Sequence, residues 1–213
     1  LCFHGIGRCR VEREPGEARY WIDEKVFLGV LDGVAARQDV HLSFDDGNVS
    51  DVDVALPALR ERGLSATFFA LAGRLDEASS LSAADLRDLR AAGMVIGNHG
   101  WRHISWRGLG PRDEQRELVE ARSVLEEACG ADVTTAALPL GRYDRAVLGS
   151  LRRTGYQTVF TSDRFPVRPS SWLQARYSVT ADDTVESVMA MAGARWGSGE
   201  VRNLVASAVK RLR

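Results

Sequence analysis

The stretch "VHLSFDDG" (residues 40–47) places two adjacent aspartates, Asp45 and Asp46, at the end of an apolar run. The apolar residues 40–44 predict a buried strand, and residues 50–63, which end at a glycine, predict the helix that follows. An Asp-Gly turn needs only one carboxylate, and two neighbouring negative charges repel each other. The pair therefore indicates either a chemical site at this strand end or, as the alternative, an unusually acidic turn.

The same alternation of strand and helix continues along the whole chain. Further strands are expected at residues 1–7, 65–73, 94–100, 133–138, 156–161 and 173–179, and helices at 24–36, 82–93, 111–128, 144–154 and most of 183–211. Repeated strand–helix units predict parallel strands, here six or seven. The expected fold is a single α/β domain over residues 1–213, closed or nearly closed into a barrel, with a doubly wound open sheet as the alternative. In both folds the chemistry lies at the carboxyl ends of the strands.

Composition excludes several classes of partner. The 28 basic and 29 acidic residues give a net charge of −1, which predicts no nucleic-acid partner. No apolar run is long enough for a transmembrane helix, and three cysteines without a CxxC pair predict no disulfide framework. The chain starts inside a predicted strand, so a trimmed N-terminus is expected. A cytoplasmic location is favoured, and an extracytoplasmic one is the alternative if a preceding segment was removed.

Three of the four histidines fall at predicted strand ends or in the loops that follow them: His4, His99 and His103. The i, i+4 spacing of "HGWRH" (99–103) allows two imidazoles to converge on one ion. Two histidines and one carboxylate form a common catalytic set for a divalent metal such as Zn²⁺. One aspartate of the pair would then bind the metal, while the other accepts a proton from activated water. Two ordinary loop histidines are the alternative.

Three stretches together resemble the polysaccharide deacetylase family, carbohydrate esterases with the NodB-like fold. They are "SFDDG" (43–47), "HGWRH" (99–103) and "LPLGRYD" (138–144), which are similar in order and spacing to the three motifs of the family. The resemblance implies a distorted (β/α)₇ barrel. It also implies a metal-dependent hydrolase that removes N-acetyl groups from an amino sugar in a polysaccharide or glycoconjugate.

The resemblance also implies roles for individual residues. Asp45 matches the catalytic base of the family. Asp46, His99 and His103 match the ligands of one divalent metal, which we expect to be Zn²⁺. The third motif implies an oxyanion-binding backbone N–H at Leu140, with Pro139 beside it in contact with the substrate. Trp101, between the two metal-binding histidines, is predicted to stack on a sugar ring, because pyranose faces pack well on aromatic rings.

The chain departs from the family pattern at three places. Gly100 replaces the usual Ser or Thr of the second motif, so we expect a less tightly braced metal loop. The arginine that often opens the third motif is absent, and we expect Arg176 to supply the positive charge near the substrate, with Asp163 as its partner. No histidine follows His103, so His4 is predicted to be the catalytic acid, as in family members whose motif order is circularly permuted.

Two other functions fit the same residues. A non-catalytic carbohydrate-binding module on this fold is one, although it predicts a broken motif and the four residues Asp45, Asp46, His99 and His103 are all present. A metal-dependent amidohydrolase that acts on a non-sugar amide is the other, since the same catalytic set would serve it.

Overall fold

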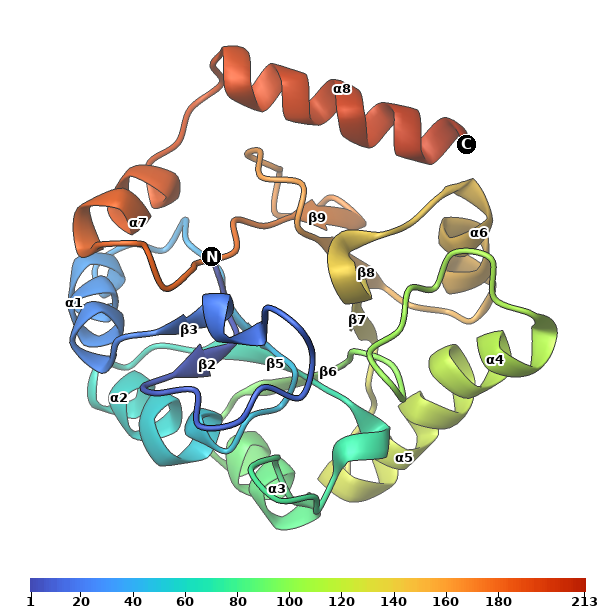
Figure 1. Ribbon diagram of the computed structural model, residues 1–213, viewed down its shortest axis with the longest axis horizontal. Coiled ribbons are helices and arrows are strands. Elements are labelled where there is room, and N and C mark those ends of the chain that lie inside the picture. The colour runs from blue at the N-terminus through green and yellow to red at the C-terminus, as the bar shows by residue number, and fades with distance from the viewer.

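A computed structural model describes residues 1–213 and shows a curled parallel sheet surrounded by helices (Figure 1). The seven strands of the sheet lie in the order β1 (Cys2–Phe3), β4 (Leu42–Asp45), β5 (Ala66–Ala70), β6 (Val95–Asn98), β7 (Thr135–Ala137), β8 (Thr158–Thr161) and β9 (Leu173–Ala175). All neighbouring pairs are parallel. The chain just after β9 returns to β1 through a parallel bridge between Cys2 and Ser178. The predicted distorted (β/α)₇ barrel is thus confirmed.

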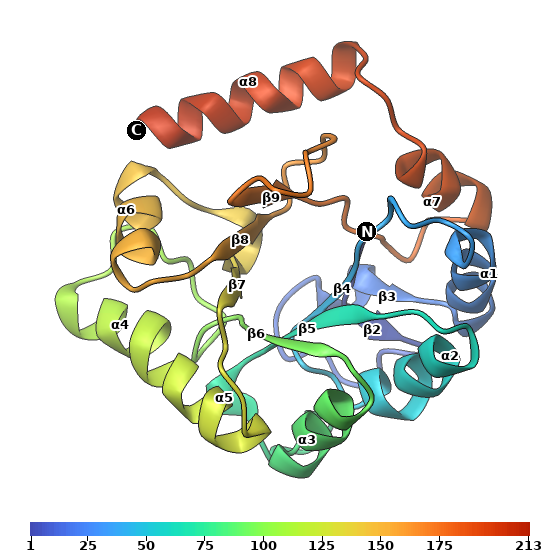
Figure 2. The same cartoon turned by 180° about the vertical axis from the view of Figure 1, so that it is seen from behind.

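Helices cover the outside of the sheet, as Figure 2 shows from the opposite side. They are α1 (Glu24–Val34), α2 (Leu56–Glu61), α3 (Ala83–Ala91), α4 (Pro111–Gln115), α5 (Ala121–Cys129), α6 (Arg145–Arg153), α7 (Val185–Ala192) and α8 (Ser198–Leu212). Short 3₁₀ helices form η1 (Glu17–Tyr20), η3 (Ala72–Arg74) and η5 (Pro139–Gly141), and π-helical segments form η2 (Asp51–Ala55) and η4 (Arg116–Glu120). Side chains that accept backbone N–H bonds begin several of them, for example Ser82 at α3 and Asp144 at α6. No helix is both long and apolar enough to cross a membrane.

The first predicted strand, 1–7, is broken at His4. Residues Gly5–Ile6 form β2, which pairs with β3 (Trp21–Ile22) in a separate two-stranded sheet. The break lies at the end of β1, beside the end of β4. His4 therefore sits at the carboxyl edge of the barrel, where the fold places its functional residues.

Alternating residues of the strands face either the helices or the inside of the barrel. Phe44 and Phe68 stack at 4.6 Å between ring centroids within the large core between sheet and helices. On the opposite face, Phe69 and Phe160 lie 5.1 Å apart and form a small core inside the barrel. Successive strand residues point to opposite faces, so Asp45, next to Phe44, points into the barrel.

Gly97 in β6 has no side chain, so the side chains of Phe69 and Thr135 can pack closely against this strand. A Cβ atom there would lie 2.4 Å from the Phe69 ring and 2.8 Å from Thr135 Oγ1. We therefore expect Gly97→Ala to lower the free energy of unfolding by about 2 kcal/mol through overpacking. Urea unfolding followed by circular dichroism measures the change.

Gly199 in α8 provides the matched control, since a Cβ there would meet nothing within 4 Å. Alanine at that position should leave stability unchanged or raise it by up to about 1 kcal/mol, as expected for a helix. Equal stability of the Gly97→Ala and wild-type proteins would contradict the tight packing inside the barrel.

Candidate active site

Asp45 and Asp46 face the same cavity although they are adjacent in the chain. Asp45 is the last residue of β4, and Asp46 leaves the strand in the left-handed region with φ 77°. Aspartate is one of the few residues other than glycine that adopt this region readily. Side chains that would alternate on a regular strand therefore converge, and both carboxylates are buried, with 4% and 6% of the residue exposed.

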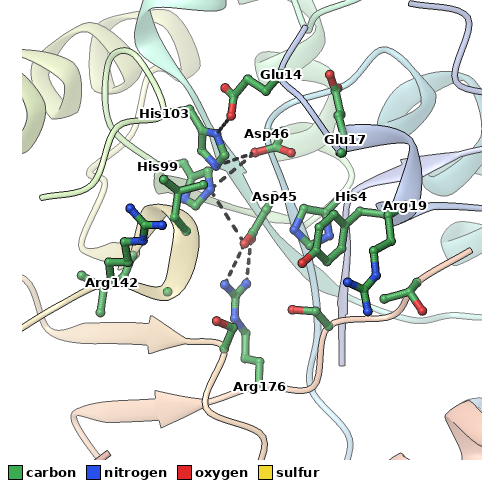
Figure 3. Close-up of a pocket in the computed structure, with 18 of the residues that line it drawn as sticks. His4, Glu14, Glu17, Arg19, Asp45, Asp46, His99, His103, Arg142 and Arg176 are labelled. Atoms are coloured by element: carbon green, nitrogen blue, oxygen red, sulfur yellow. Dashed lines mark hydrogen bonds and ion pairs between the residues drawn. The ribbon is translucent and has the colours of Figure 1, made fainter. Parts of the chain in front are cut away.

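Asp46, His99 and His103 form a three-residue group that could hold a metal ion. The Nε2 atoms of His99 and His103 lie 3.5 and 3.4 Å from Asp46 Oδ1, and the three donor atoms all lie within 4.8 Å of one another (Figure 3). Asp46 Oδ1 is buried and has no hydrogen-bond partner in the protein. A buried carboxylate oxygen without a partner is costly, and a divalent cation would satisfy it. These residues therefore fit the predicted metal.

Hydrogen bonds orient both imidazoles of this group. His99 Nδ1 donates to the Ala137 carbonyl at 2.9 Å, and His103 Nδ1 donates to Glu14 Oε2 at 2.7 Å. Each Nε2 is therefore left with its lone pair directed toward Asp46, as metal ligation requires. Burial lowers the pKa of His99 to about 4, which keeps it neutral. Glu14 was not predicted, because it lies 89 residues before His103 and is in no motif.

The loop that carries the two histidines is braced by buried polar groups, which makes the expectation of a loosely held loop wrong. Glu117 is fully buried, and its Oε2 accepts a hydrogen bond from the backbone N–H of Trp101 at 2.7 Å. Asn98 Oδ1 accepts another from the Gly100 N–H at 2.8 Å. Gly100 has φ 94°, and a Cβ there would lie 2.5 Å from Glu117 Oε2. The carboxylate thus occupies the space that a side chain at position 100 would need.

Arg176 binds the other aspartate of the pair. Its two terminal nitrogens donate to the two oxygens of Asp45 at 2.7 and 2.8 Å, and Nη1 also donates to Ser43 Oγ at 2.9 Å. Burial would raise the pKa of Asp45, but the charge of Arg176 and its hydrogen bonds outweigh it and hold that pKa below its usual range. Asp45 is therefore ionised and fixed in orientation. Its oxygens are engaged by Arg176, which leaves Asp46 as the better metal ligand.

The predicted partner of Arg176 is therefore wrong. Asp163 instead accepts hydrogen bonds from Tyr143 Oη at 2.6 Å and Thr161 Oγ1 at 3.0 Å, and it pairs with Lys210 of α8 at 2.5 Å. Arg176 lines the cavity, but its guanidinium is bound to Asp45. It is therefore a positioning residue for Asp45 rather than a free substrate-binding group.

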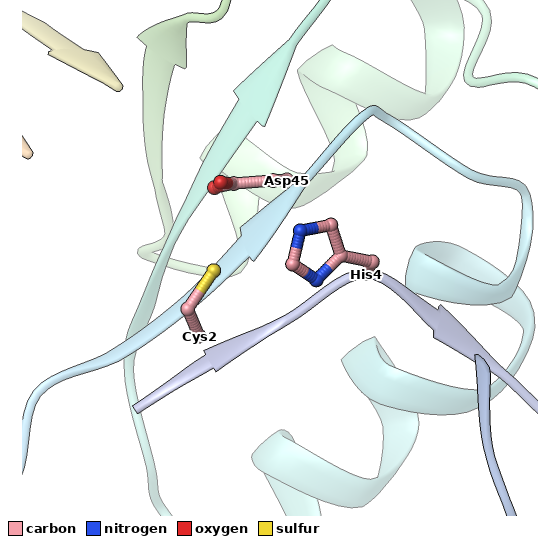
Figure 4. A group of neighbouring side chains, drawn as sticks. All are labelled: Cys2, His4 and Asp45. Carbon is pink, nitrogen blue, oxygen red and sulfur yellow. The ribbon is translucent and has the colours of Figure 1, made fainter. Parts of the chain in front are cut away.

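His4 lies on the side of Asp45 opposite His99 (Figure 3). Its ring packs on Tyr20 with centroids 4.7 Å apart. With Cys2 and Asp45 it forms a second group whose donor atoms lie within 4.8 Å of one another (Figure 4). Both carboxylate oxygens of Asp45 already accept hydrogen bonds from Arg176, so one of the three donors of this group is engaged. This second group therefore fits a metal poorly, and His4 keeps its imidazole for other chemistry.

Of the two third-motif residues that were predicted to meet the substrate, Leu140 lines the cavity and Pro139 does not. Leu140 lines the cavity, is 51% exposed, and has a left-handed backbone with φ 58°. Pro139 is buried and does not line the cavity. Trp101 does not line it either, because its ring packs on the main core with the Arg116 guanidinium 4.5 Å from its centroid. The structure thus provides no sugar-stacking position for Trp101.

The cavity above these residues has a volume of about 410 Å³ and a polar lining. Only three of its 21 lining residues are hydrophobic, and it contains His4, both aspartates and both motif histidines. A polar cavity of this size suits a hydroxyl-rich ligand better than an apolar one.

Comparison with known proteins agrees with this geometry. The family model for polysaccharide deacetylase matches residues 32–159, which include the aspartate pair and both metal-loop histidines. The chain belongs to the polysaccharide deacetylase family. Its match with a chitooligosaccharide deacetylase of Sinorhizobium fredii (strain NBRC 101917 / NGR234) is 29% identical over 151 residues, which cover 70% of this chain and 66% of that protein. For three curated relatives that it matches, the chain spans 44%, 66% and 67% of their length.

Several solved structures share this fold. The Streptococcus pyogenes deacetylase PplD, solved in complex with acetate, has a TM-score of 0.78 at 18% identity, covering 90% of this chain and 96% of that one. IcaB from Ammonifex degensii has a TM-score of 0.73 at 24% identity, covering 91% and 95%. At these identities the likeness shows the polysaccharide deacetylase fold.

The brace at Glu117 generates a prediction for metal binding. Glu117→Gln keeps the size of the side chain but removes the charge that orders the Trp101 and Arg102 N–H groups. We expect zinc affinity, measured by competition with a chelating dye, to fall about 10- to 100-fold. Glu120→Gln, on an exposed position of the same helical segment, is the control. Unchanged affinity in Glu117→Gln would contradict the bracing role.

A further buried carboxyl group, that of Asp51, interacts electrostatically with the aspartate pair. Asp51 in η2 is fully buried, and neither of its side-chain oxygens has a hydrogen-bond partner. Burial, and then the charges of Asp46 and Asp45, raise the pKa of Asp51 well above its usual value. The folded state therefore holds a proton that the unfolded chain releases above about pH 4, so this group destabilises the fold increasingly as pH rises above that value.

We expect Asp51→Asn to raise the free energy of unfolding of the metal-free protein more at pH 8 than at pH 5. A neutral amide cannot ionise, so the variant removes the pH-dependent penalty. Urea unfolding at both pH values measures this difference. Asp53→Asn, two residues away and exposed, is the control and should show no such dependence. An increase of equal size at both pH values would contradict the assignment of a neutral Asp51.

Proposed function

We propose that this chain is a metal-dependent hydrolase that removes N-acetyl groups from an amino sugar within a glycan. The observation that carries the proposal is the arrangement of one polar cavity. There the Nε2 atoms of His99 and His103 converge with the unpartnered oxygen of Asp46, and the ionised Asp45, bound by Arg176, lies beside them. Membership of the polysaccharide deacetylase family supports it. The intact donor set argues against a binding module that has lost its chemistry.

The ligands of the metal would be Asp46, His99 and His103, and two imidazoles with one carboxylate favour Zn²⁺. A divalent ion at this position supplies Lewis-acid activation of water and of the substrate carbonyl. The protein's part is to keep the histidines neutral and oriented, through the Ala137 carbonyl and Glu14.

Asp45 is the proposed general base. It is ionised, and the Arg176 fork fixes the direction of its lone pairs. It accepts a proton from the attacking water as the carbon–oxygen bond forms. The backbone N–H of Leu140, in its left-handed turn at the cavity wall, stabilises the negative charge that develops on the carbonyl oxygen.

His4 is the proposed general acid. Its ring lies across Asp45 from His99 (Figure 3) and lines the cavity, and we assign this side of the cavity to the leaving amine. It gives a proton to the sugar nitrogen as the carbon–nitrogen bond breaks, and the products are acetate and a free amino sugar. The packing of its ring on Tyr20 holds it in the cavity.

Two substitutions separate the base from the metal ligands. With the zinc-loaded protein, Asp45→Asn should lower acetate release from N-acetylglucosamine oligomers by about 10³-fold and retain the metal. His103→Ala should lose both the metal and the activity. Metal content by mass spectrometry and acetate by a coupled assay give the two readouts.

His41→Ala is the matched control, because His41 stacks on Phe160 and does not line the cavity. It should retain metal and activity, and thermal unfolding shows whether each variant is folded. Acetate release by a folded Asp45→Asn protein at the wild-type rate would contradict the proposed base.

A further inference from the structure

Three of the four acidic groups that line the cavity have an arginine partner within the protein. Asp45 is bound by Arg176, Glu17 by Arg13, and Glu14 by His103 and Arg74. Asp46 faces the two histidines that we assign to the metal. The three paired carboxylates therefore leave no uncompensated negative charge for a substrate to meet, and a bound divalent ion would more than balance the charge of Asp46.

Three arginines that line the same cavity have no carboxylate partner. Arg19, Arg142 and Arg164 are all exposed, and none forms an ion pair in this structure. Arg164 lies over the Tyr177 ring at 5.8 Å, and the nearby Asp183 bonds to Thr180 instead. The cavity mouth thus carries an excess of guanidinium groups, although the whole chain has a net charge of −1.

The three arginines come from different parts of the barrel edge. Arg19 belongs to η1, Arg142 follows η5, and Arg164 follows β8. Figure 3 shows Arg19 and Arg142 on opposite sides of the aspartate and histidine cluster. Positive charge is therefore distributed around the site rather than gathered at one point, as suits a ligand with several separated negative groups.

Guanidinium groups recognise carboxylates and phosphates through charge-assisted, often bidentate hydrogen bonds. A neutral sugar is recognised through its hydroxyl groups and by stacking on aromatic rings. The lining contains a single aromatic side chain other than histidine, Tyr20, and that ring packs on His4. The cavity thus offers charge recognition and little surface for stacking.

We propose that the substrate is an anionic glycan, in which carboxylate or phosphate groups lie close to the N-acetyl amino sugar and bind Arg19, Arg142 and Arg164. This inference rests on the proposed deacetylase function and names its substrate class. The carboxylate and the phosphate share the chemistry that a guanidinium recognises, so the probes below separate them.

The test compares three oligomers with the same backbone, using the zinc-loaded protein. The neutral probe is the β-1,4-linked N-acetylglucosamine tetramer, and the charged probes carry either carboxylates at C6 or phosphates at O6. We expect kcat/KM for acetate release to be at least about tenfold higher for one charged probe than for the neutral one. The preferred probe identifies the anion.

Substitution of the arginines shows whether they cause the preference. Arg142→Gln and Arg19→Gln should each lower kcat/KM for the preferred charged probe about fivefold to tenfold and leave the neutral probe unchanged. Arg60→Gln is the matched control, because Arg60 is an exposed arginine of α2 without an ion pair and away from the cavity. A neutral probe hydrolysed as fast as both charged ones would overturn the inference.

Equilibrium binding separates this inference from the proposed function. The three tetramers are titrated by calorimetry into the zinc-loaded Asp45→Asn protein, with and without Arg142→Gln. Tighter binding of a charged tetramer that is lost in Arg142→Gln supports the anionic substrate class. If the wild-type protein then releases acetate from none of the probes, the proposed deacetylation fails instead. Equal binding of all three tetramers overturns the inference whether or not acetate is released.

Discussion

The ion pair between Arg176 and Asp45 holds the site together. Both residues are buried, with 5% and 4% exposed, and 131 residues separate them in the chain. Removing two charges from water is costly, and only a fully bonded geometry offsets that cost. Here the guanidinium makes two hydrogen bonds to the carboxylate and a third to the Ser43 hydroxyl. The rings of Phe69 and Phe160 pack beside it, with their centroids 5.2 and 5.6 Å from the guanidinium carbon. The pair also ties the chain after β9 to the end of β4, next to the bridge that closes the barrel.

This arrangement explains why the chain places two aspartates side by side. The arginine engages Asp45 from inside the barrel, while the left-handed backbone at Asp46 turns the second carboxylate toward the two histidines. Their negative charges are thereby matched to different cations, one a guanidinium and the other the proposed metal. The histidines are prepared for the same task, because each donates its Nδ1 hydrogen to an acceptor and keeps Nε2 for the ion. The different surroundings of Asp45 and Asp46 therefore give two identical side chains different proposed roles, one as the base and the other as a metal ligand.

Much of the fold and the motif residues could be predicted from sequence, because their signals are local. The aspartate pair was expected at the carboxyl end of a strand, where the structure has it, and strand–helix alternation predicted the barrel itself. Contacts between distant segments have no such local signal. Glu14 and Glu117 orient or brace the metal loop but lie outside every motif. Arg176 was predicted to lie near the site, but its partner was predicted wrongly. A single arginine in the sequence does not reveal which distant carboxylate it pairs with. Trp101 was misjudged because position between two histidines does not fix the direction of a side chain in a turning loop.

The proposed mechanism depends most on where the metal binds. Anomalous X-ray diffraction at the zinc absorption edge, on crystals grown with zinc, measures this directly. Two clusters of donor atoms lie close to Asp45 and Asp46, and only one of them is assigned to the ion. The proposed mechanism predicts a single anomalous peak coordinated by Asp46, His99 and His103, with Arg176 still bound to Asp45. A peak coordinated by Cys2, His4 and Asp45, or crystals with zinc in solution and no peak at either cluster, would contradict it.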